Sequence, residues 1–157
     1  MITNLPNTNA VEITNAQAVF PLRQIDKPKV LIVEDHDDTR EMLRVLLELK
    51  KCEVVEACNG LEAVEIANRE QPDLILMDGS LPLLDGLEAT RRIRENELLG
   101  EVLILALNGW GTPAFQAAAL AAGCDDCMTK PIDFEELERY MAPLFDRCAA
   151  ARMTTAA

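Results

Sequence analysis

Carboxylates and one lysine directly follow apolar runs that have the composition of buried strands. Glu34 and Asp35 follow the run VLIV, Asp78 ends the run DLILMD, and Lys130 follows the weaker run CDDCMT. Neighbouring carboxylates repel one another by about 4 kcal/mol per pair at ~4 Å and an effective dielectric of roughly 20, so such a cluster requires a cation or a raised pKa. Carboxylates are ligands for Mg²⁺, and an ammonium can hold an anion. The set predicts a phosphoryl-transfer site in which a carboxylate can be the nucleophile.

Strands and helices alternate along the chain in the order needed to bring these residues together. Apolar runs predict five strands, at 30–34, 53–57, 73–78, 102–107 and 124–129. Helical spacing and capping residues predict five helices. Asp37 or Asp38 can cap the first, the second follows the turn at Asn59–Gly60, and the others cover 83–97, 112–122 and 133–142. Strands that are apolar on both faces and alternate with helices indicate a doubly wound α/β fold, with a parallel sheet covered on both sides. Such sheets bind ligands at the carboxyl ends of their strands, where the acids and the lysine lie.

The composition is that of one globular domain with an acidic surface. The 157 residues are 49% hydrophobic and 27% charged, which argues against disorder, and the length corresponds to a single core. The net charge of −12 repels nucleic acid and anionic lipid, so we expect no nucleic acid and no membrane as a partner. No apolar run reaches the roughly 20 residues that span a bilayer, and the first residues lack the basic start of a signal peptide. With five cysteines, an odd number, the composition favours a reduced, cytoplasmic protein.

The two ends of the chain differ in composition from its middle. Residues 1–28 are rich in Asn, Thr and small residues, and they predict an arm that is flexible or ordered by docking. Residues 29–148 contain the predicted strands and helices, and 149–157 predict a frayed tail. Because proline disrupts a helix interior at a cost of ~3 kcal/mol or more, Pro143 is expected to end or kink the last helix near Ala142.

Four motifs at consistent spacing carry a resemblance to a known family. They are Glu34–Asp35 after VLIV, MDGSLPLLDG at 77–86, Asn108–Gly109 after LAL, and GCDDCMTKPID at 123–133. Together they resemble the receiver domain of two-component response regulators, over residues 29 to about 142. The resemblance implies the flavodoxin-like receiver fold with strand order 2-1-3-4-5, which the chemotaxis receiver shares. It also implies a stand-alone phosphoacceptor protein of a phosphorelay that signals through protein–protein contacts.

The resemblance assigns the carboxylates to a phosphoryl group and a metal. Asp78 corresponds to the phosphoacceptor, which takes a phosphoryl group from a phosphohistidine or a small acyl phosphate. Glu34, Asp35 and Asp78 would hold Mg²⁺ together with the backbone carbonyl of Ser80, Asp35 directly and Glu34 through water. The implied partners are a sensor histidine kinase or a histidine phosphotransfer protein and a downstream protein target, with a homodimer as a further option.

Three further positions correspond to residues around the phosphoryl group. Lys130 would contact the phosphoryl oxygens and the Asp78 carboxylate, and the backbone N–H of Gly109 would donate to the phosphoryl group. Pro131 would hold the following loop through the cis Lys–Pro bond that is common in receivers. Receivers promote only their own phosphorylation and dephosphorylation, so no other enzymatic activity is expected.

The chain departs from the family pattern at two positions that normally transmit the phosphorylation state. Asn108 stands where receivers usually have Thr or Ser, and its longer amide must approach a phosphoryl group differently. Cys127 stands where they usually have Tyr or Phe, three residues before the lysine. The sequence therefore predicts intact phosphoryl chemistry with an atypical switch. The alternative is a degenerate receiver that acts as an interaction module without phosphorylation.

Several other residues have two interpretations. Trp110 is either an aromatic residue packed on the rim of the site or, together with Ser80, a control on the access of water to the acyl phosphate. His36 is expected to face solvent rather than to bind a metal. The C-x-x-C spacing of Cys124 and Cys127 resembles a redox pair, but neighbouring acids would raise the thiol pKa values, which favours small buried cysteines. An aspartyl phosphatase is disfavoured because Ser80 stands where such enzymes need a second Asp.

Overall fold

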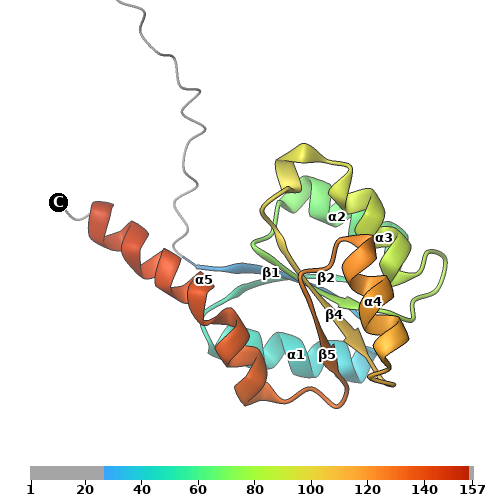
Figure 1. The fold of residues 1–157 in the computed structure, drawn as a ribbon. Coiled ribbons are helices and arrows are strands. Elements are labelled where there is room, and N and C mark those ends of the chain that lie inside the picture. The colour runs from blue at the N-terminus through green and yellow to red at the C-terminus, as the bar shows by residue number, and fades with distance from the viewer. Residues whose placement is uncertain (1–26, 156–157) are drawn as a thin grey trace, which may run out of the picture.

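Five parallel strands form the centre of the molecule in a computed structural model that describes residues 27–155. The strands are β1 (Lys29–Val33), β2 (Glu53–Ala57), β3 (Leu74–Asp78), β4 (Leu103–Asn108) and β5 (Asp126–Thr129). They form one sheet in the order β2-β1-β3-β4-β5, with every neighbouring pair parallel (Figure 1). The predicted doubly wound α/β fold and its strand order 2-1-3-4-5 are confirmed.

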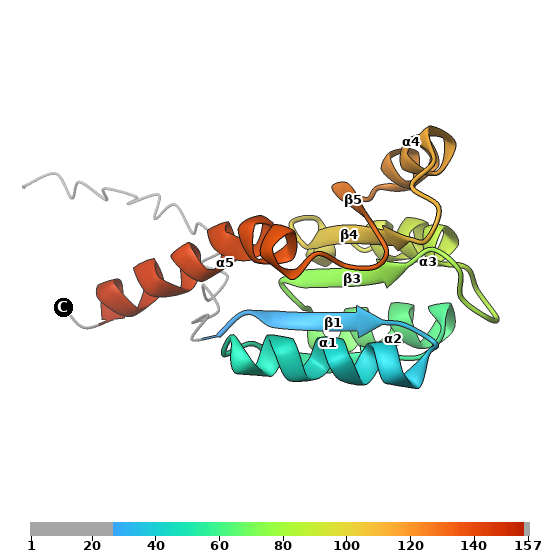
Figure 2. The ribbon, with the colours of Figure 1, turned by 90° about the horizontal axis from the view of Figure 1, so that it is seen from below.

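Helices cover both faces of this sheet. They are α1 (Asp37–Leu49), α2 (Gly60–Glu70), α3 (Gly86–Arg94), α4 (Pro113–Ala122) and α5 (Phe134–Thr155), with a short 3₁₀ helix at Glu97–Leu99. α1 and α5 lie on one face of the sheet (Figures 1 and 2). Their apolar side chains form one cluster with that face, which we call the α1/α5 layer. Side chains of α2, α3 and α4 form a second cluster on the other face, the α2–α4 layer. No helix between residues 27 and 155 combines the length and hydropathy that a membrane span requires.

The register of the strands brings their carboxyl ends to one edge of the sheet. Val33 of β1 pairs with Met77 of β3, so the residues that follow, Glu34 and Asp78, lie side by side. The ends of β4 and β5 are aligned in the same way, at Asn108. The polar residues that follow the apolar runs in the sequence therefore share one edge.

Polar side chains start α3 and α4, two of the helices of the α2–α4 layer that begin at this edge. Asp85 accepts hydrogen bonds from two N–H groups in the first turn of α3, and Thr112 accepts one from the Phe115 N–H in α4. The third helix is shorter than the predicted range 83–97, because it begins after Asp85 and ends at Arg94. Leu83 cannot belong to it, since its φ of 67° is left-handed.

The close approach of α3 to β3 requires glycine at the first position of the helix. A β-carbon at Gly86 would overlap the carbonyl oxygen of Asp78. The Asp-Gly pair that ends the motif MDGSLPLLDG thus has a physical explanation. Asp85 caps the helix, and Gly86 lets its backbone pack against the end of β3.

The start of α1 differs from its prediction. The sequence predicts Asp37 or Asp38 as the capping residue, but the N-cap is His36, whose side chain makes no capping hydrogen bond. Asp37 forms an ion pair with Arg40 within the first turns instead. The prediction of an aspartate cap is therefore wrong, and the side chain of His36 is directed to the edge of the sheet.

The last helix is longer than predicted. α5 continues through Pro143 to Thr155, so the expectation that it ends near Ala142 is wrong, while the alternative of a kink at Pro143 stays a prediction. Burial of Leu144 in the α1/α5 layer stabilises the helix beyond the proline, which itself cannot donate a backbone hydrogen bond. Residues 149–155, predicted as part of a frayed tail, belong to these last turns. The turns project beyond the sheet on the side where the strands begin (Figure 2).

The predicted N-terminal arm, residues 1–28, falls outside the described residues except for its last two positions, Lys27 and Pro28. The strand β1 begins directly after it, at Lys29.

Candidate functional site

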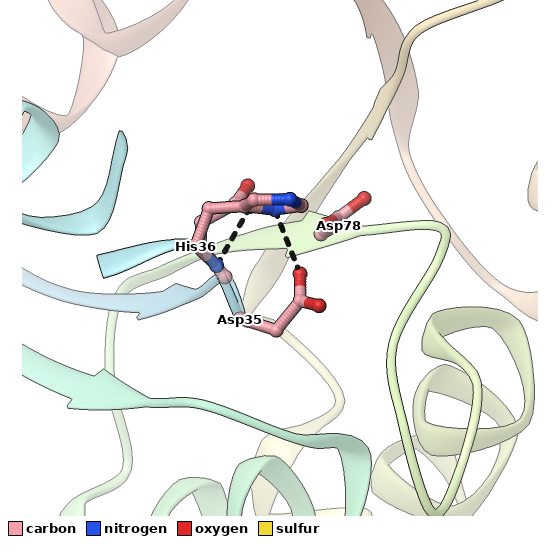
Figure 3. Close-up of side chains that lie close together, drawn as sticks. Asp35, His36 and Asp78 are labelled. Atoms are coloured by element: carbon pink, nitrogen blue, oxygen red, sulfur yellow. Dashed lines mark hydrogen bonds and ion pairs between the residues drawn. The ribbon is translucent and has the colours of Figure 1, made fainter. Parts of the chain in front are cut away.

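Four side chains with metal-binding atoms meet at the edge where β1 and β3 end. Figure 3 labels three of them, Asp35, His36 and Asp78. Carboxylate oxygens of Glu34, Asp35 and Asp78 and a ring nitrogen of His36 all lie within 4.8 Å of one another. The three acids predicted at strand ends are thus brought together. His36 is an addition: its side chain is 75% exposed, as expected, yet its Nδ1 is directed back to the acids. Its position directly after the acidic pair is the only indication of this role in the sequence.

Glu34 is the most enclosed of the acids. Its side chain is fully buried, and both carboxylate oxygens have partners. Oε2 lies 2.5 Å from Lys130 Nζ, and Oε1 lies 3.0 Å from His36 Nδ1. Arg40 donates a hydrogen bond of 2.9 Å to the backbone carbonyl of Glu34. Because both side-chain oxygens are used in this way, Glu34 is better placed to act on a cation through water than directly.

Lys130 stands between two carboxylates. Its ammonium contacts Glu34, and it forms a longer ion pair with Asp78 Oδ2 at 3.4 Å. Burial lowers the pKa of Lys130, but the hydrogen bond to Glu34 and the charges of Asp78 and Glu34 more than offset this. The pKa is raised as a result, and the ammonium stays charged. The peptide bond from Lys130 to Pro131 is cis.

Asp78, the last residue of β3, is buried, and its neighbours compensate only partly for the burial of its charge. The Ser80 N–H donates to its Oδ1 at 3.1 Å, and Lys130 lies near its Oδ2. Burial and then the charge of Glu34 raise the pKa of Asp78, while Ser80 and Lys130 act in the opposite direction. The net result is a raised pKa, which is the condition of a carboxylate that gains from a nearby cation.

The arrangement of charges fits a hard divalent cation. Three carboxylates and one ammonium leave a net charge of −2 (−3 + 1) while His36 is neutral. Asp35 and Asp78 offer oxygen ligands on the open side, where the side chain of Asp35 is 32% exposed. Mg²⁺ prefers carboxylate oxygens and keeps several of its waters, so a site with two direct carboxylates and an open side suits it. A protonated His36 would compete with this cation for the negative charge of the carboxylates.

The end of β4 forms the opposite wall of the site. Asn108 is buried, and its Oδ1 accepts a hydrogen bond from the Trp110 N–H at 3.3 Å. A β-carbon at Gly109 would have no atom within 4 Å, so the backbone there is open to an incoming group. The side chain of Trp110 is 84% exposed, and it is therefore not packed on the rim. The roles of the Gly109 N–H and the Ser80 carbonyl stay predictions.

The two cysteines of the C-x-x-C sequence are separate thiols. Cys124 is buried, Cys127 is half-buried on β5, and no disulfide joins them. Burial raises the pKa values of both thiols, more than the neighbouring acids do. Cys127 pairs with Ala106 and packs in the α2–α4 layer. The position at which receivers usually carry an aromatic ring thus holds only a thiol.

A hollow of about 620 Å³ opens beside Asp78, between the loops that follow β3 and β4. Its lining includes Gly79 and Ser80 after β3, Trp110 after β4, and Phe115 of α4. The sequence did not single out Phe115, because its spacing in α4 is that of an ordinary core residue.

The chain matches the family model of the response regulator receiver domain over residues 30–142. It belongs to this family. The match includes β2 to β5, all of β1 except its first residue, and the loops that carry the site. The protein is therefore a receiver domain of two-component signalling, and the resemblance drawn from its motifs is confirmed.

Several named proteins resemble this receiver. It is 34% identical over 116 residues to the polar-differentiation response regulator DivK of Brucella anthropi, which covers 71% of this chain and 94% of that protein. It is 32% identical over 120 residues to the DNA-binding dual master transcriptional regulator RpaA of Synechocystis, and the match spans 76% of this chain but only 50% of that longer protein.

Solved structures show the same fold. The receiver domain of the sensor histidine kinase PA1611 from Pseudomonas aeruginosa, which has a magnesium ion coordinated in its active site cleft, matches with a TM-score of 0.69 at 35% identity. That match covers 73% of this chain and 94% of the other. A chain of the co-crystal structure of the Saccharomyces cerevisiae histidine phosphotransfer protein Ypd1 with the receiver domain of Ssk1 matches with a TM-score of 0.69 at 35% identity, over 73% of this chain and 86% of that one.

Proposed function

We propose that this receiver accepts a phosphoryl group on Asp78 with the help of Mg²⁺ and signals through protein–protein contacts. The observation that carries the proposal is the position of Asp78, which lies at the end of β3, 3.4 Å from the Lys130 ammonium and within 4.8 Å of the other two acids. Its buried carboxylate is close to the positive charge that an incoming phosphoryl group needs. Membership of the receiver family supports the same assignment.

The proposed chemistry follows from the atoms at the site. An Asp78 oxygen attacks the phosphorus of a phosphohistidine, the P–N bond breaks, and the donor imidazole leaves as the acyl phosphate forms. The Ser80 N–H holds Asp78 Oδ1 in place, and Lys130 offsets negative charge on the phosphoryl oxygens. Mg²⁺, held by Asp35 and Asp78 with Glu34 acting through water, would neutralise further charge. Attack of water on the acyl phosphate later releases phosphate and restores the carboxylate.

The proposed phosphoryl donor is a sensor histidine kinase or a histidine phosphotransfer protein, and the output is a downstream protein target. The Ypd1–Ssk1 complex is an example of a similar receiver domain with a phosphotransfer protein. The net charge of −12 supports protein partners over nucleic acid. A cytoplasmic location and, as an option, a homodimer belong to the same proposal.

Intact mass is the direct test. The protein is incubated with Mg²⁺ and a small acyl phosphate, alongside Asp78→Asn and the control Asp146→Asn, which removes an exposed aspartate of α5. One added phosphoryl group is expected in the wild type and the control, and none in Asp78→Asn or without Mg²⁺. An adduct that persists in Asp78→Asn would contradict the assignment of the phosphoacceptor.

A receiver that acts without phosphorylation is the second candidate. It is favoured by Asn108, whose amide oxygen is bonded to the Trp110 N–H and which lacks the hydroxyl usual at this position. Absence of an adduct, together with absence of any Mg²⁺-dependent change in Trp110 fluorescence, would favour this interaction module. An adduct in the wild type would exclude it.

A further inference from the structure

An aromatic ring of α4 lies against the backbone next to the proposed phosphoacceptor. A β-carbon built on Gly79, the residue after Asp78, would lie 2.7 Å from both Cε2 and Cζ of Phe115. Such a distance is too short for real carbon atoms, so the tip of the ring occupies the place where a side chain at position 79 would be. The end of β3 and the start of α4 are thus in direct contact through one ring.

Both sides of this contact are anchored by hydrogen bonds. The Gly79 N–H donates to the carbonyl of Leu107 at 2.9 Å, and the next N–H, of Ser80, donates to the Asp78 carboxylate. On the other side, the Phe115 N–H donates to the cap oxygen of Thr112 at 3.2 Å. The backbone after Asp78 and the first turn of α4 are therefore connected through this contact without a flexible segment in between.

The opposite wall of the hollow connects to the same turn. Asn108 and Trp110 are joined by a hydrogen bond from the Trp110 N–H to the Asn108 amide oxygen. Trp110 lies two residues before Thr112, and both residues line the hollow together with Phe115. A phosphoryl group on Asp78 would face this wall as well, so Phe115 lies where the two loops of the site converge.

No other ring is available for this position in the part of the chain that the structure describes. Phe115 is the one aromatic residue among residues 27–155 that packs in the α2–α4 layer. Trp110 is exposed, and the remaining aromatic side chains pack in the α1/α5 layer, namely Phe134, Tyr140 and Phe145. Cys127, at the usual ring position of the family, faces the same layer as Phe115.

We propose that Phe115 is the positioning residue that transmits the phosphorylation state of Asp78 to α4, in place of the ring missing at Cys127. The proposal rests on the proposed function of Asp78. A phosphoryl group adds oxygens at the Asp78 carboxylate, and the Ser80 N–H and the Gly79 backbone adjust to them. The ring of Phe115 moves with Gly79, and α4 follows because Phe115 belongs to its first turn. Phe115 itself does not take part in the bond-making step.

Amide hydrogen exchange in α4 is the measurement, with phosphorylation scored by intact mass in the same samples. The full chain is treated with Mg²⁺ and acetyl phosphate. Exchange rates of the α4 amides are expected to change at least about fivefold in the wild type, the lower end of typical coupling between sites. Phe115→Ala is expected to take up the phosphoryl group while α4 no longer responds. The control Phe145→Ala, which removes the same ring from the α1/α5 layer, is expected to keep both uptake and response.

A second substitution tests the contact between Gly79 and Phe115 in the absence of phosphorylation. Gly79→Ala adds a methyl group that must displace the ring, so it is expected to alter exchange in α4 of the unphosphorylated protein. The same substitution in the Phe115→Ala background is expected to leave α4 unchanged. Where Phe115→Ala fails to fold by circular dichroism, Phe115→Leu replaces it, since Leu keeps apolar volume but lacks the ring that reaches Gly79.

The outcomes separate this proposal from the proposed function. No uptake in the wild type refutes the function of Asp78, and the coupling with it. Uptake without any response of α4 in the wild type refutes the coupling alone. The coupling is also refuted by a full response of α4 in the phosphorylated Phe115 variants.

Discussion

The ammonium of Lys130 and the carboxylate of Glu34, 96 positions apart in the chain, form an ion pair of 2.5 Å in which the carboxylate is fully buried. The same ammonium lies 3.4 Å from Asp78, so one positive charge offsets two negative charges at the end of the central strands. The stability of this edge and the proposed binding of a phosphoryl group therefore involve the same lysine.

Loss of the lysine charge should destabilise the protein strongly. Lys130→Met removes the one ammonium that Glu34 and Asp78 share, and removing one partner of a buried pair costs about 3–5 kcal/mol. We expect a loss of about 3 kcal/mol in urea unfolding. The control Lys50→Met breaks an exposed pair with Glu138 of 2.7 Å and should cost less than about 1 kcal/mol. Equal losses of unfolding free energy in the two variants would show that the buried ion pair contributes no more to stability than the exposed pair.

Removal of the Asp78 charge should stabilise the metal-free protein. Burial and the charge of Glu34 raise the pKa of Asp78, so the folded protein disfavours the ionised form of this carboxylate relative to the unfolded chain. In a chelator, Asp78→Asn is expected to raise Tm by about 2–4 °C, which is about 1 kcal/mol for a domain of this size.

The stabilisation caused by Asp78→Asn should increase with pH. Because the folded pKa of Asp78 is raised above its ordinary 3.8, the penalty is absent below that pH and develops as pH rises through the folded value. The difference in Tm between Asp78→Asn and the wild type should therefore vanish below 3.8 and grow toward neutrality. A difference that is constant with pH would contradict this origin. Mg²⁺ should reduce the difference, because the proposed metal site uses the Asp78 carboxylate, which the variant lacks.

His36 should titrate above its ordinary value of 6.5. The hydrogen bond to Glu34, followed by the charges of Asp35 and Glu34, raises the pKa of His36. Its favourable interaction with the acids is therefore complete below pH 6.5 and is lost as pH rises through the folded pKa.

Proton NMR of the single imidazole gives this pKa directly. Asp35→Asn should lower it, and Mg²⁺ should lower it as well, since the cation takes the same negative charge. A pKa of His36 that does not respond to Mg²⁺ would place the cation away from this group.

Substitution by alanine should affect the free energy of unfolding differently at Gly86 and at Gly109. Gly86→Ala drives a β-carbon into the carbonyl of Asp78, and overpacking against backbone costs about 1–3 kcal/mol. Gly109→Ala meets open space and should change the free energy of unfolding by less than about 0.5 kcal/mol. Urea unfolding of both variants compares them under one condition. Similar values would mean that α3 can shift away from β3 at little cost.

Trp110 should slow the loss of the phosphoryl group if its ring limits the access of water. The ring is 84% exposed at the mouth of the hollow, so the effect of one side chain is expected to be small. Trp110→Ala should speed hydrolysis of the acyl phosphate about threefold, equivalent to under about 1 kcal/mol of barrier, and Trp110→Phe should have an intermediate rate. The decay of the phosphorylated mass over time measures this. An unchanged rate would remove Trp110 from the control of water.

The site acids could be placed from the sequence because their geometry depends on strands. Glu34, Asp78 and Lys130 each follow a recognisable apolar run, and parallel strands bring their carboxyl ends to one edge. Strand ends are well marked in such a chain, since the strands are short and apolar on both faces.

The remaining features depend on contacts that a local pattern does not contain. His36 reaches the acids because α1 begins at Asp37, one residue earlier than an aspartate cap would allow. α5 passes Pro143 because Leu144 is buried beyond it, which offsets the missing backbone donor. Phe115 has the spacing of a core residue, and only the fold shows that its ring lies on Gly79. In each case a tertiary contact outweighs the local preference.

The charged residues of the site lie within two positions of a strand, so the hydrogen-bond ladder of the sheet rather than a loop sets their spacing. A cation bound at the proposed site would find its ligands already in place and would order little additional chain. Its binding should therefore involve little loss of conformational entropy and little change in heat capacity. Connections at the opposite edge of the sheet carry none of these residues, and they can lengthen during evolution without altering the chemistry.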